Sequence, residues 1–261
     1  MTTSTYLLDS ARELERLRLQ SRVWEPAGRE LLESCGAGTG LRALDVGCGA
    51  LGWLRILSAW VGPAGHVVGT DVATPLLAAA RALIDEDALA NVEVVHDDLF
   101  ASDLEPGAFD LVHARTLLIN IINPDEIIIG MKHLARPGGT VAVQEPDTTY
   151  WVCDPPHPAW DRLIAAYQAA YRLQGRDFAI GRRLGRLLNQ AALQDVNTHA
   201  HVFKTRAGDV YQKLLIGVAD AARRSRRVAG DAGSGGEPQS AADTARPVRQ
   251  RDRRGGGSRQ R

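Results

Sequence analysis

The chain has 261 residues, 44% of them hydrophobic and 24% charged, a composition typical of a globular protein with one sizeable α/β domain. Its formal net charge is zero, which argues against a nucleic-acid-binding protein and against attachment to a membrane surface. The three cysteines are scattered without a CxxC pair, so we expect neither a disulfide framework nor a metal site.

Two further features bear on location. The segment Met1–Ser10 is polar and does not resemble a signal peptide. The longest apolar run, Leu117–Ile129, is interrupted by polar residues and by Pro124, so it is not expected to span a bilayer. We therefore expect a cytoplasmic protein, a monomer or homodimer, that does not interact with a membrane.

The first half of the chain predicts alternating strands and helices. Residues 10–35 have a helical pattern that Pro26 is expected to divide into two helices, and residues 1–40 are expected to form an N-terminal helical cap. The expected strands are Arg42–Val46, His66–Thr70, Val92–Val95, Phe109–His113 and Thr140–Gln144, and the expected helices are Leu51–Trp60, Thr74–Ile84 and Asp125–Ala135. This alternation predicts an α/β fold with a doubly wound, mostly parallel sheet.

The second half has a different character. Residues 157–193 are mostly helical in pattern and are expected to form a lid inserted in a domain that spans 41–222. Within that domain, Val196–Phe203 alternates like a strand, and a helix is expected at Asp209–Ala222. Residues 223–261 are rich in Arg and Gly and poor in large aliphatic residues, which predicts a disordered tail.

A glycine-rich turn lies between the first expected strand and the following helix. Gly47 suits a tight turn with positive φ, and Gly49 allows the backbone to approach a ligand closely. The spacing also fits the dinucleotide fingerprint GxGxxG, which alone is weak support for a nucleotide site.

Acidic residues at successive strand ends favour one kind of nucleotide. Asp71 ends the second strand, where a carboxylate can accept both ribose hydroxyls, and Asp98 follows the third strand, where it can bind an adenine amino group with Leu99 or Phe100 against the ring. Asp45, beside the glycine turn, would repel a pyrophosphate and attract a cationic sulfonium compound. The residues thus favour S-adenosylmethionine over NAD, which stays the alternative cofactor.

Five stretches resemble class I (Rossmann-like) S-adenosylmethionine-dependent methyltransferases, in particular the small-molecule type 11 group. They read LDVGCGALG, VVGTDVATPLLAAAR, NVEVVHDDLF, FDLVHARTLL and LARPGGTVAVQEPD, and they cover residues 41–147 in the order and spacing of that family. The resemblance implies an S-adenosylmethionine-binding core at 41–147 and methyl transfer to a small-molecule acceptor. The cofactor-binding residues that it implies are Asp45, Gly47, Cys48, Gly49, Asp71, Val72, Asp98, Leu99 and Arg115.

The N-terminal segment also resembles the cap of this group, with Tyr6, Arg16 and Gln20 as candidates to close over the methionine carboxylate. The other interpretation is a packed amphipathic helix with solvated charges. For the reaction itself, His113, Asp147, Tyr150 and His157 follow or end the last two strands, but none can be assigned as a catalytic base.

The chain departs from the family near its C-terminus. Such domains end in an antiparallel pair of strands, and here the Arg/Gly tail replaces the second strand, so the final antiparallel strand is expected to be missing. We hypothesise that the tail is frameshifted or otherwise aberrant. The leading function is methyl transfer to a small molecule. The alternatives are a cofactor-binding protein whose catalysis is lost or impaired by the aberrant C-terminus and, less favoured, an RNA methyltransferase that uses the basic tail.

Overall fold

A computed structural model describes residues 11–50, 52–206, 208–210 and 212. The chain runs through five strands, β1 (Arg42–Val46), β2 (His66–Asp71), β3 (Val92–His96), β4 (Phe109–Arg115) and β5 (Ala135–Gln144). The α-helices are α1 (Ala11–Ser34), α2 (Leu54–Val61), α3 (Thr74–Glu86), α4 (Pro124–Leu134), α5 (Pro158–Leu173) and α6 (Leu184–Gln190). Short 3-10 helices are η1 (Leu99–Ala101), η2 (Leu118–Asn120), η3 (Thr148–Tyr150) and η4 (Ile180–Arg183).

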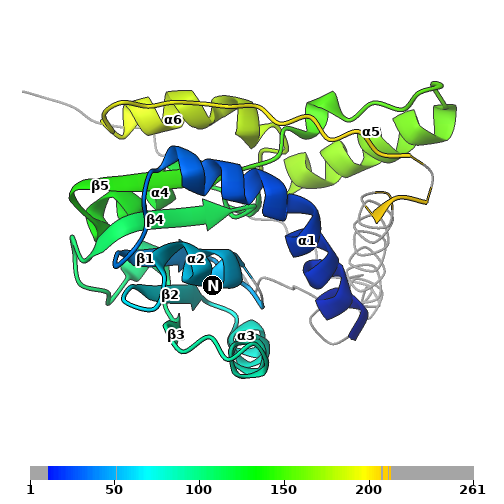
Figure 1. The fold of residues 1–261 in the computed structure, drawn as a ribbon. Helices are drawn as coiled ribbons and strands as arrows, with labels where there is room; N and C mark the ends of the chain where they lie inside the picture. The colour runs from blue at the N-terminus through cyan, green and yellow to red at the C-terminus, as the bar shows by residue number, and fades with distance from the viewer. Residues whose placement is uncertain (1–10, 51, 207, 211, 213–261) are drawn as a thin grey trace, which may run out of the picture. The chain divides into compact units, whose positions relative to one another are not determined.

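All five strands are parallel and lie in the order β3-β2-β1-β4-β5 (Figure 1). The order changes direction at β1, where β2 and β3 extend to one side and β4 and β5 to the other. A parallel neighbour can be reached only through a crossover, and helices supply these crossovers. The carboxyl ends of β1 and β4 therefore open next to each other at a topological switch point, where ligands bind in open α/β sheets.

Two hydrophobic clusters cover the two faces of the sheet. One joins α1, α2 and α3 to the sheet and includes the buried side chains of Leu32, Trp53 and Leu77. The other includes Ile128 and Leu187 and joins α4 and α6 to the opposite face. Burial on both faces explains why the inner strands β1 and β4 consist mainly of apolar residues.

The prediction of two helices separated at Pro26 is wrong. The helix α1 continues through Pro26, and Figure 1 shows that it changes direction along its length. A proline in a helix interior removes one backbone hydrogen bond and bends the helix, and neighbouring turns can keep the helix continuous. Packing of Ala27 and Leu32 into the core holds the second half of α1 against the sheet.

The predicted strand at Val196–Phe203 is also wrong. These residues have no regular secondary structure, although their apolar residues alternate. Val202 is 86% exposed, whereas the ring of Phe203 packs edge-on against Trp24 of α1 at a centroid distance of 4.7 Å. A strand needs a partner for its backbone hydrogen bonds, and within the described residues the edge of the sheet next to β5 has no antiparallel neighbour.

Most of the remaining C-terminal predictions lie outside the described residues. These are most of the helix expected at Asp209–Ala222, the tail at 223–261 and the hypothesis of a frameshift. Every described residue belongs to a compact unit, Met1–Ser225. None of the described helices is both long and apolar enough to cross a bilayer.

Candidate cofactor site

The glycine turn after β1 has the backbone that the sequence predicts. Gly47 has φ +66° and Gly49 has φ +59°, a left-handed conformation that side chains rarely adopt. A Cβ on Gly47 would lie 2.7 Å from the Leu117 side chain, so this position also needs glycine for packing. By contrast, the nearest atom to a Cβ on Gly49 is in Leu76, 4.0 Å away. The backbone of Gly49 therefore borders open space that a ligand can enter.

Asp71, the last residue of β2, fixes the position of this turn. One carboxylate oxygen accepts a hydrogen bond from the Gly49 N–H at 2.9 Å, and the other accepts from the Ala73 N–H at 2.8 Å. Burial raises the pKa of Asp71, while the two backbone donors lower it. The carboxylate thus joins the loops that follow two neighbouring strands, at the edge where a ribose would lie.

Two exposed apolar side chains lie in the loops that follow β2 and β3. Val72 is 53% exposed and Phe100 is 50% exposed. Leu99 is only partly exposed, and its side chain lies against α4, since a Cβ on Gly130 would be 3.0 Å from it. Of the two side chains considered for the adenine ring, Phe100 is therefore the accessible one.

Asp98 is exposed and holds the turn that carries Phe100. Its carboxylate accepts a hydrogen bond from the Phe100 N–H at 3.1 Å and caps η1. The preceding Asp97 is buried, and one of its carboxylate oxygens accepts from the Asp103 N–H at 3.1 Å. The two acidic residues after β3 thus have different environments, since Asp97 is buried and Asp98 is exposed to solvent.

Asp45 lies inside the protein and does not face the ligand space. It is 1% exposed, and its two oxygens accept from the Trp53 N–H at 2.8 Å and bond to His113 Nδ1 at 2.7 Å. His113 is fully buried and stacks on the Trp53 ring at 4.0 Å. The charge of Asp45 still reaches the site, because it contributes to raising the pKa values of Asp71 and Cys48.

Cys48 is buried beneath the glycine turn and packs towards β2, where a Cβ on Gly69 would lie 3.0 Å from its sulfur. Burial, followed by the charges of Asp45 and Asp71, raises the pKa of the thiol well above its usual value. The thiol therefore stays protonated, and the side chain packs in the core while its backbone lies in the turn.

A second buried polar cluster lies where β4 and β5 end. Glu145 accepts hydrogen bonds from the backbone N–H groups of Leu117, Leu118 and Ile119 at 2.8, 2.7 and 3.2 Å. Burial raises the pKa of Glu145 to about 8 despite these donors and nearby Arg115. Sequence reasoning gave Glu145 no role, although it lies within one of the five stretches that carry the family resemblance.

Arg115, the last residue of β4, has unused hydrogen-bonding capacity. Its Nε and Nη1 atoms are buried and have no hydrogen-bond partner, and nor does the Gln144 side-chain oxygen at the end of β5. Burial lowers the pKa of Arg115, while Asp45 and Glu145 raise it. Orphaned donors of this kind are rare in proteins and point towards a bound polar group.

The four residues considered as catalytic bases are engaged elsewhere. His113 is bonded to Asp45 in the core, and Asp147 accepts from Arg182 Nε at 2.6 Å. The ring of Tyr150 lies 5.1 Å from the Arg182 guanidinium. His157 caps α5 by accepting from the Ala159 N–H at 3.1 Å. Among the described residues, no group of three or more His, Cys, Asp or Glu side chains has the arrangement of a metal site.

The chain is similar to known methyltransferases in sequence and fold. The methyltransferase domain family matches residues 37–201. A demethylmenaquinone methyltransferase of Listeria welshimeri is 30% identical over 128 residues, which are 49% of this chain and 52% of the relative. The demethylmenaquinone methyltransferase of Lactococcus lactis is 36% identical over 110 residues, which are 41% of this chain and 42% of the relative. The chain thus spans about half the length of these curated relatives.

Among solved structures, a phosphoethanolamine N-methyltransferase 2 of Haemonchus contortus has the same fold. It was solved with phosphomonomethylethanolamine and S-adenosylhomocysteine, and it matches 82% of this chain and 45% of its own with a TM-score of 0.53 at 17% identity. A parallel sheet in this order, with a glycine turn at the switch point, is a Rossmann-like α/β arrangement, and the match shows that methyltransferases share it. The chain belongs to the methyltransferase domain family, and its cofactor is S-adenosylmethionine. The predicted family, fold class and cofactor are confirmed.

The residues at the strand ends fit this cofactor. The open backbone at Gly49, the carboxylate of Asp71 and the exposed side chains of Val72 and Phe100 lie on adjacent loops at one edge of the sheet. An adenosyl group offers ribose hydroxyls to the carboxylate and an aromatic ring to the apolar side chains.

Proposed function

We propose that this protein transfers a methyl group from S-adenosylmethionine to a small-molecule acceptor at the carboxyl ends of β1 and β4. The observation that carries this proposal is the bond between Asp71 and the Gly49 N–H beside open space, with exposed apolar side chains in the loops that follow β2 and β3. The curated relatives are named for the methylation of demethylmenaquinone, which supports a small molecule as the acceptor.

The following roles are proposed for the cofactor site. Gly47 and Gly49 shape the turn around the methionine end, and Asp71 accepts the ribose hydroxyls. Val72 and Phe100 enclose the adenine ring, and Asp98 accepts from its amino group. Cys48 and Leu99 contribute backbone and packing, since their side chains are turned towards the core. Asp45 acts through its charge because both of its oxygens have protein partners.

Arg115 is proposed to hold the methionine carboxylate. Its two orphaned N–H groups lie at the end of β4, beside the turn that follows β1. A carboxylate placed there would satisfy donors that otherwise carry a desolvation cost of about 1–3 kcal/mol each. This role uses the guanidinium, whereas the family resemblance implied only a position near the cofactor.

The acceptor is proposed to lie between the strand ends and α5. Trp151 stacks on Tyr167 at 5.7 Å, and the Tyr167 hydroxyl donates to the Tyr171 hydroxyl at 2.9 Å, which together present aromatic surface. S-adenosylmethionine supplies the methyl group on a sulfonium, which is already a good leaving group. These protein residues would then mainly orient the acceptor and exclude water.

The test is calorimetric titration with S-adenosylmethionine and with NAD, followed by an assay of S-adenosylhomocysteine formation across a panel of phenolic, quinol and amine acceptors. We expect saturable binding of S-adenosylmethionine alone and product formation with at least one acceptor. Binding without turnover would favour the alternative of a cofactor-binding protein with impaired catalysis. Binding of NAD in place of S-adenosylmethionine would overturn the proposal.

A further inference from the structure

A pocket of about 560 Å³ lies apart from the strand-end site and has a strongly basic lining. It is formed by the N-terminal end of α4, the C-terminal end of α5, the turn that follows it, the end of η4 and one side of α6 up to its last residue. Four arginines and two aspartates line it, so the formal charge of the lining is +2. None of the residues assigned to the cofactor lines this pocket. The arginines are Arg172, Arg176, Arg183 and Arg186.

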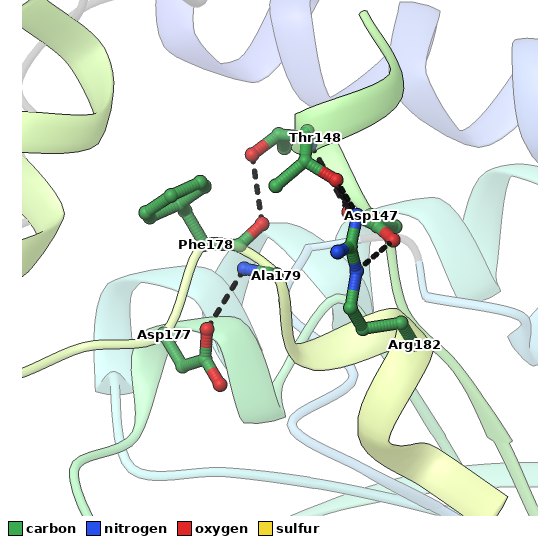
Figure 2. A network of polar contacts seen from close by, with 7 residues as sticks. Asp147, Thr148, Asp177, Phe178, Ala179 and Arg182 are labelled. Carbon is green, nitrogen blue, oxygen red and sulfur yellow. Dashed lines mark hydrogen bonds and ion pairs between the residues drawn. The ribbon is translucent and has the colours of Figure 1, made fainter. Parts of the chain in front are cut away.

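One wall of the pocket is held rigidly by the contacts that Figure 2 shows. Thr148, which is buried, donates its hydroxyl to the Phe178 carbonyl at 2.7 Å, and its backbone N–H donates to the same oxygen at 3.2 Å. Asp177 accepts from the Ala179 N–H at 2.9 Å. Arg182, in the 3-10 helix η4 that follows Ala179, bonds to Asp147. The wall is therefore built before any ligand arrives, which lowers the entropic cost of binding.

The two acidic residues of the pocket neutralise only one of its four arginines. Asp177 bonds to Arg183, so its charge is already paired. Asp125 lies in the first turn of α4, where its charge interacts with the helix dipole. Arg172 lies over the Phe178 ring at 5.6 Å, which orients its guanidinium without neutralising it. Arg172, Arg176 and Arg186 thus remain to bind an anion.

The rest of the lining is apolar apart from Gln190, which accepts a hydrogen bond from Arg186 at 3.1 Å. Ile122, which is largely exposed, lies at the pocket together with Phe178 and Leu187. Guanidinium groups match the geometry of phosphate oxygens, and a lining charge of +2 balances a dianionic phosphomonoester. An apolar wall beside those groups favours an organic substituent on the phosphate over the free ion.

We propose that this arginine-lined pocket is a second ligand site, which binds a phosphomonoester with a small apolar or aromatic substituent. The phosphate lies between Arg172, Arg176 and Arg186, and the substituent lies against Phe178 and Ile122. The site does not depend on the proposed methyl transfer, because it shares no residue with the cofactor site.

The experiment uses phenyl phosphate as the probe and calorimetry at low ionic strength, with and without saturating S-adenosylhomocysteine. We expect saturable binding at one site that weakens as salt is added and that persists in the presence of S-adenosylhomocysteine. Arg176→Gln and Arg172→Gln should each raise the Kd about tenfold, since each removes one charge-assisted contact. The matched control is Arg162→Gln on the exposed side of α5, which should leave the Kd unchanged.

A variant that is expected to tighten binding is also needed, because misfolding could explain a loss of binding but not a gain. Asp125→Asn removes a negative charge from the lining and should tighten binding of phenyl phosphate several-fold. The proposal is overturned by the absence of saturable binding, by equal weakening in Arg162→Gln, or by displacement of the probe by S-adenosylhomocysteine. Equally tight binding of inorganic phosphate would also overturn it, since the site would then not select the substituent. Equally tight binding of benzoate would do the same, since the site would then not select the phosphate.

Failure of S-adenosylmethionine binding with retained phenyl phosphate binding would refute the proposed function and leave this inference intact.

Discussion

The carboxylate of Asp71 accepts a hydrogen bond from the backbone N–H of Gly49 at 2.9 Å, across 22 residues of sequence. This bond links the ends of β1 and β2, which are neighbours in the sheet. The same oxygen atoms are the ones that ribose hydroxyls would approach. Asp71 therefore holds the turn in place, and we propose that it also presents acceptors to the cofactor.

Replacing Asp71 by alanine should weaken S-adenosylmethionine binding about 10- to 100-fold, because hydrogen bonds to a charged group contribute on the order of 1.5–3 kcal/mol. Calorimetric titration measures the effect. Asp85→Ala, an exposed carboxylate on α3, is the matched control and should leave the Kd unchanged. Equal losses in both variants would mean that net charge, and not the position of Asp71, controls binding.

Gly49→Ala should both destabilise the protein and weaken cofactor binding. Its φ of +59° disfavours any side chain, at a cost on the order of 1–2 kcal/mol, and the new methyl group would enter the ligand space. Gly36→Ala separates the two effects, because Gly36 has φ +90°, nothing within 4 Å of a Cβ, and a position in the loop that leads into the amino end of β1. We expect both variants to lower the urea midpoint of unfolding, and only Gly49→Ala to weaken S-adenosylmethionine binding.

The sequence predicted well those parts of the fold in which local pattern and burial agree. Four of the five strands were predicted with differences of at most two residues at their ends, whereas β5 begins at Ala135, five residues before the predicted Thr140, in a largely exposed stretch with no apolar run. Prediction failed at Val196–Phe203, where alternation suggested a strand that has no partner in the described sheet. The alternation of apolar residues is a property of one segment, whereas a strand also requires a neighbouring strand for its backbone hydrogen bonds.

Some features of the candidate site could likewise be predicted from the sequence, and others could not. The positive φ of Gly47 and the position of Asp71 at the end of β2 could be predicted from the sequence, because both depend on local pattern. The burial of Asp45 could not, since the residue that encloses it, His113, comes from β4, 68 residues away. Glu145 was missed for the same reason, because its three partners lie in a different loop.

Asp45→Asn should affect stability more than cofactor binding. Its carboxylate bonds to His113 Nδ1 and to the Trp53 N–H inside the core, so an amide in its place loses one of two charge-assisted contacts. We expect a loss of unfolding free energy of about 1–3 kcal/mol, measured by urea denaturation. The Kd for S-adenosylmethionine should change less than in Asp71→Ala. A larger loss of binding than of stability would show that Asp45 contacts the ligand directly.

The buried carboxyl of Glu145 should make stability depend on pH. Its pKa is about 8 in the folded protein, against 4.5 for an unperturbed glutamate, so between these values the folded state holds a proton that the unfolded state has released. Stability from this group is therefore present below about pH 4.5 and is lost as the pH rises towards 8, with a total on the order of a few kcal/mol. Glu145→Gln cannot ionise and keeps an oxygen that can accept from Leu117 and Leu118. Urea denaturation from pH 5 to pH 9 should show that the free energy of unfolding of Glu145→Gln rises relative to that of the original protein until about pH 8 and then levels off. A difference that does not change with pH would mean that the three backbone donors and Arg115 keep Glu145 ionised throughout.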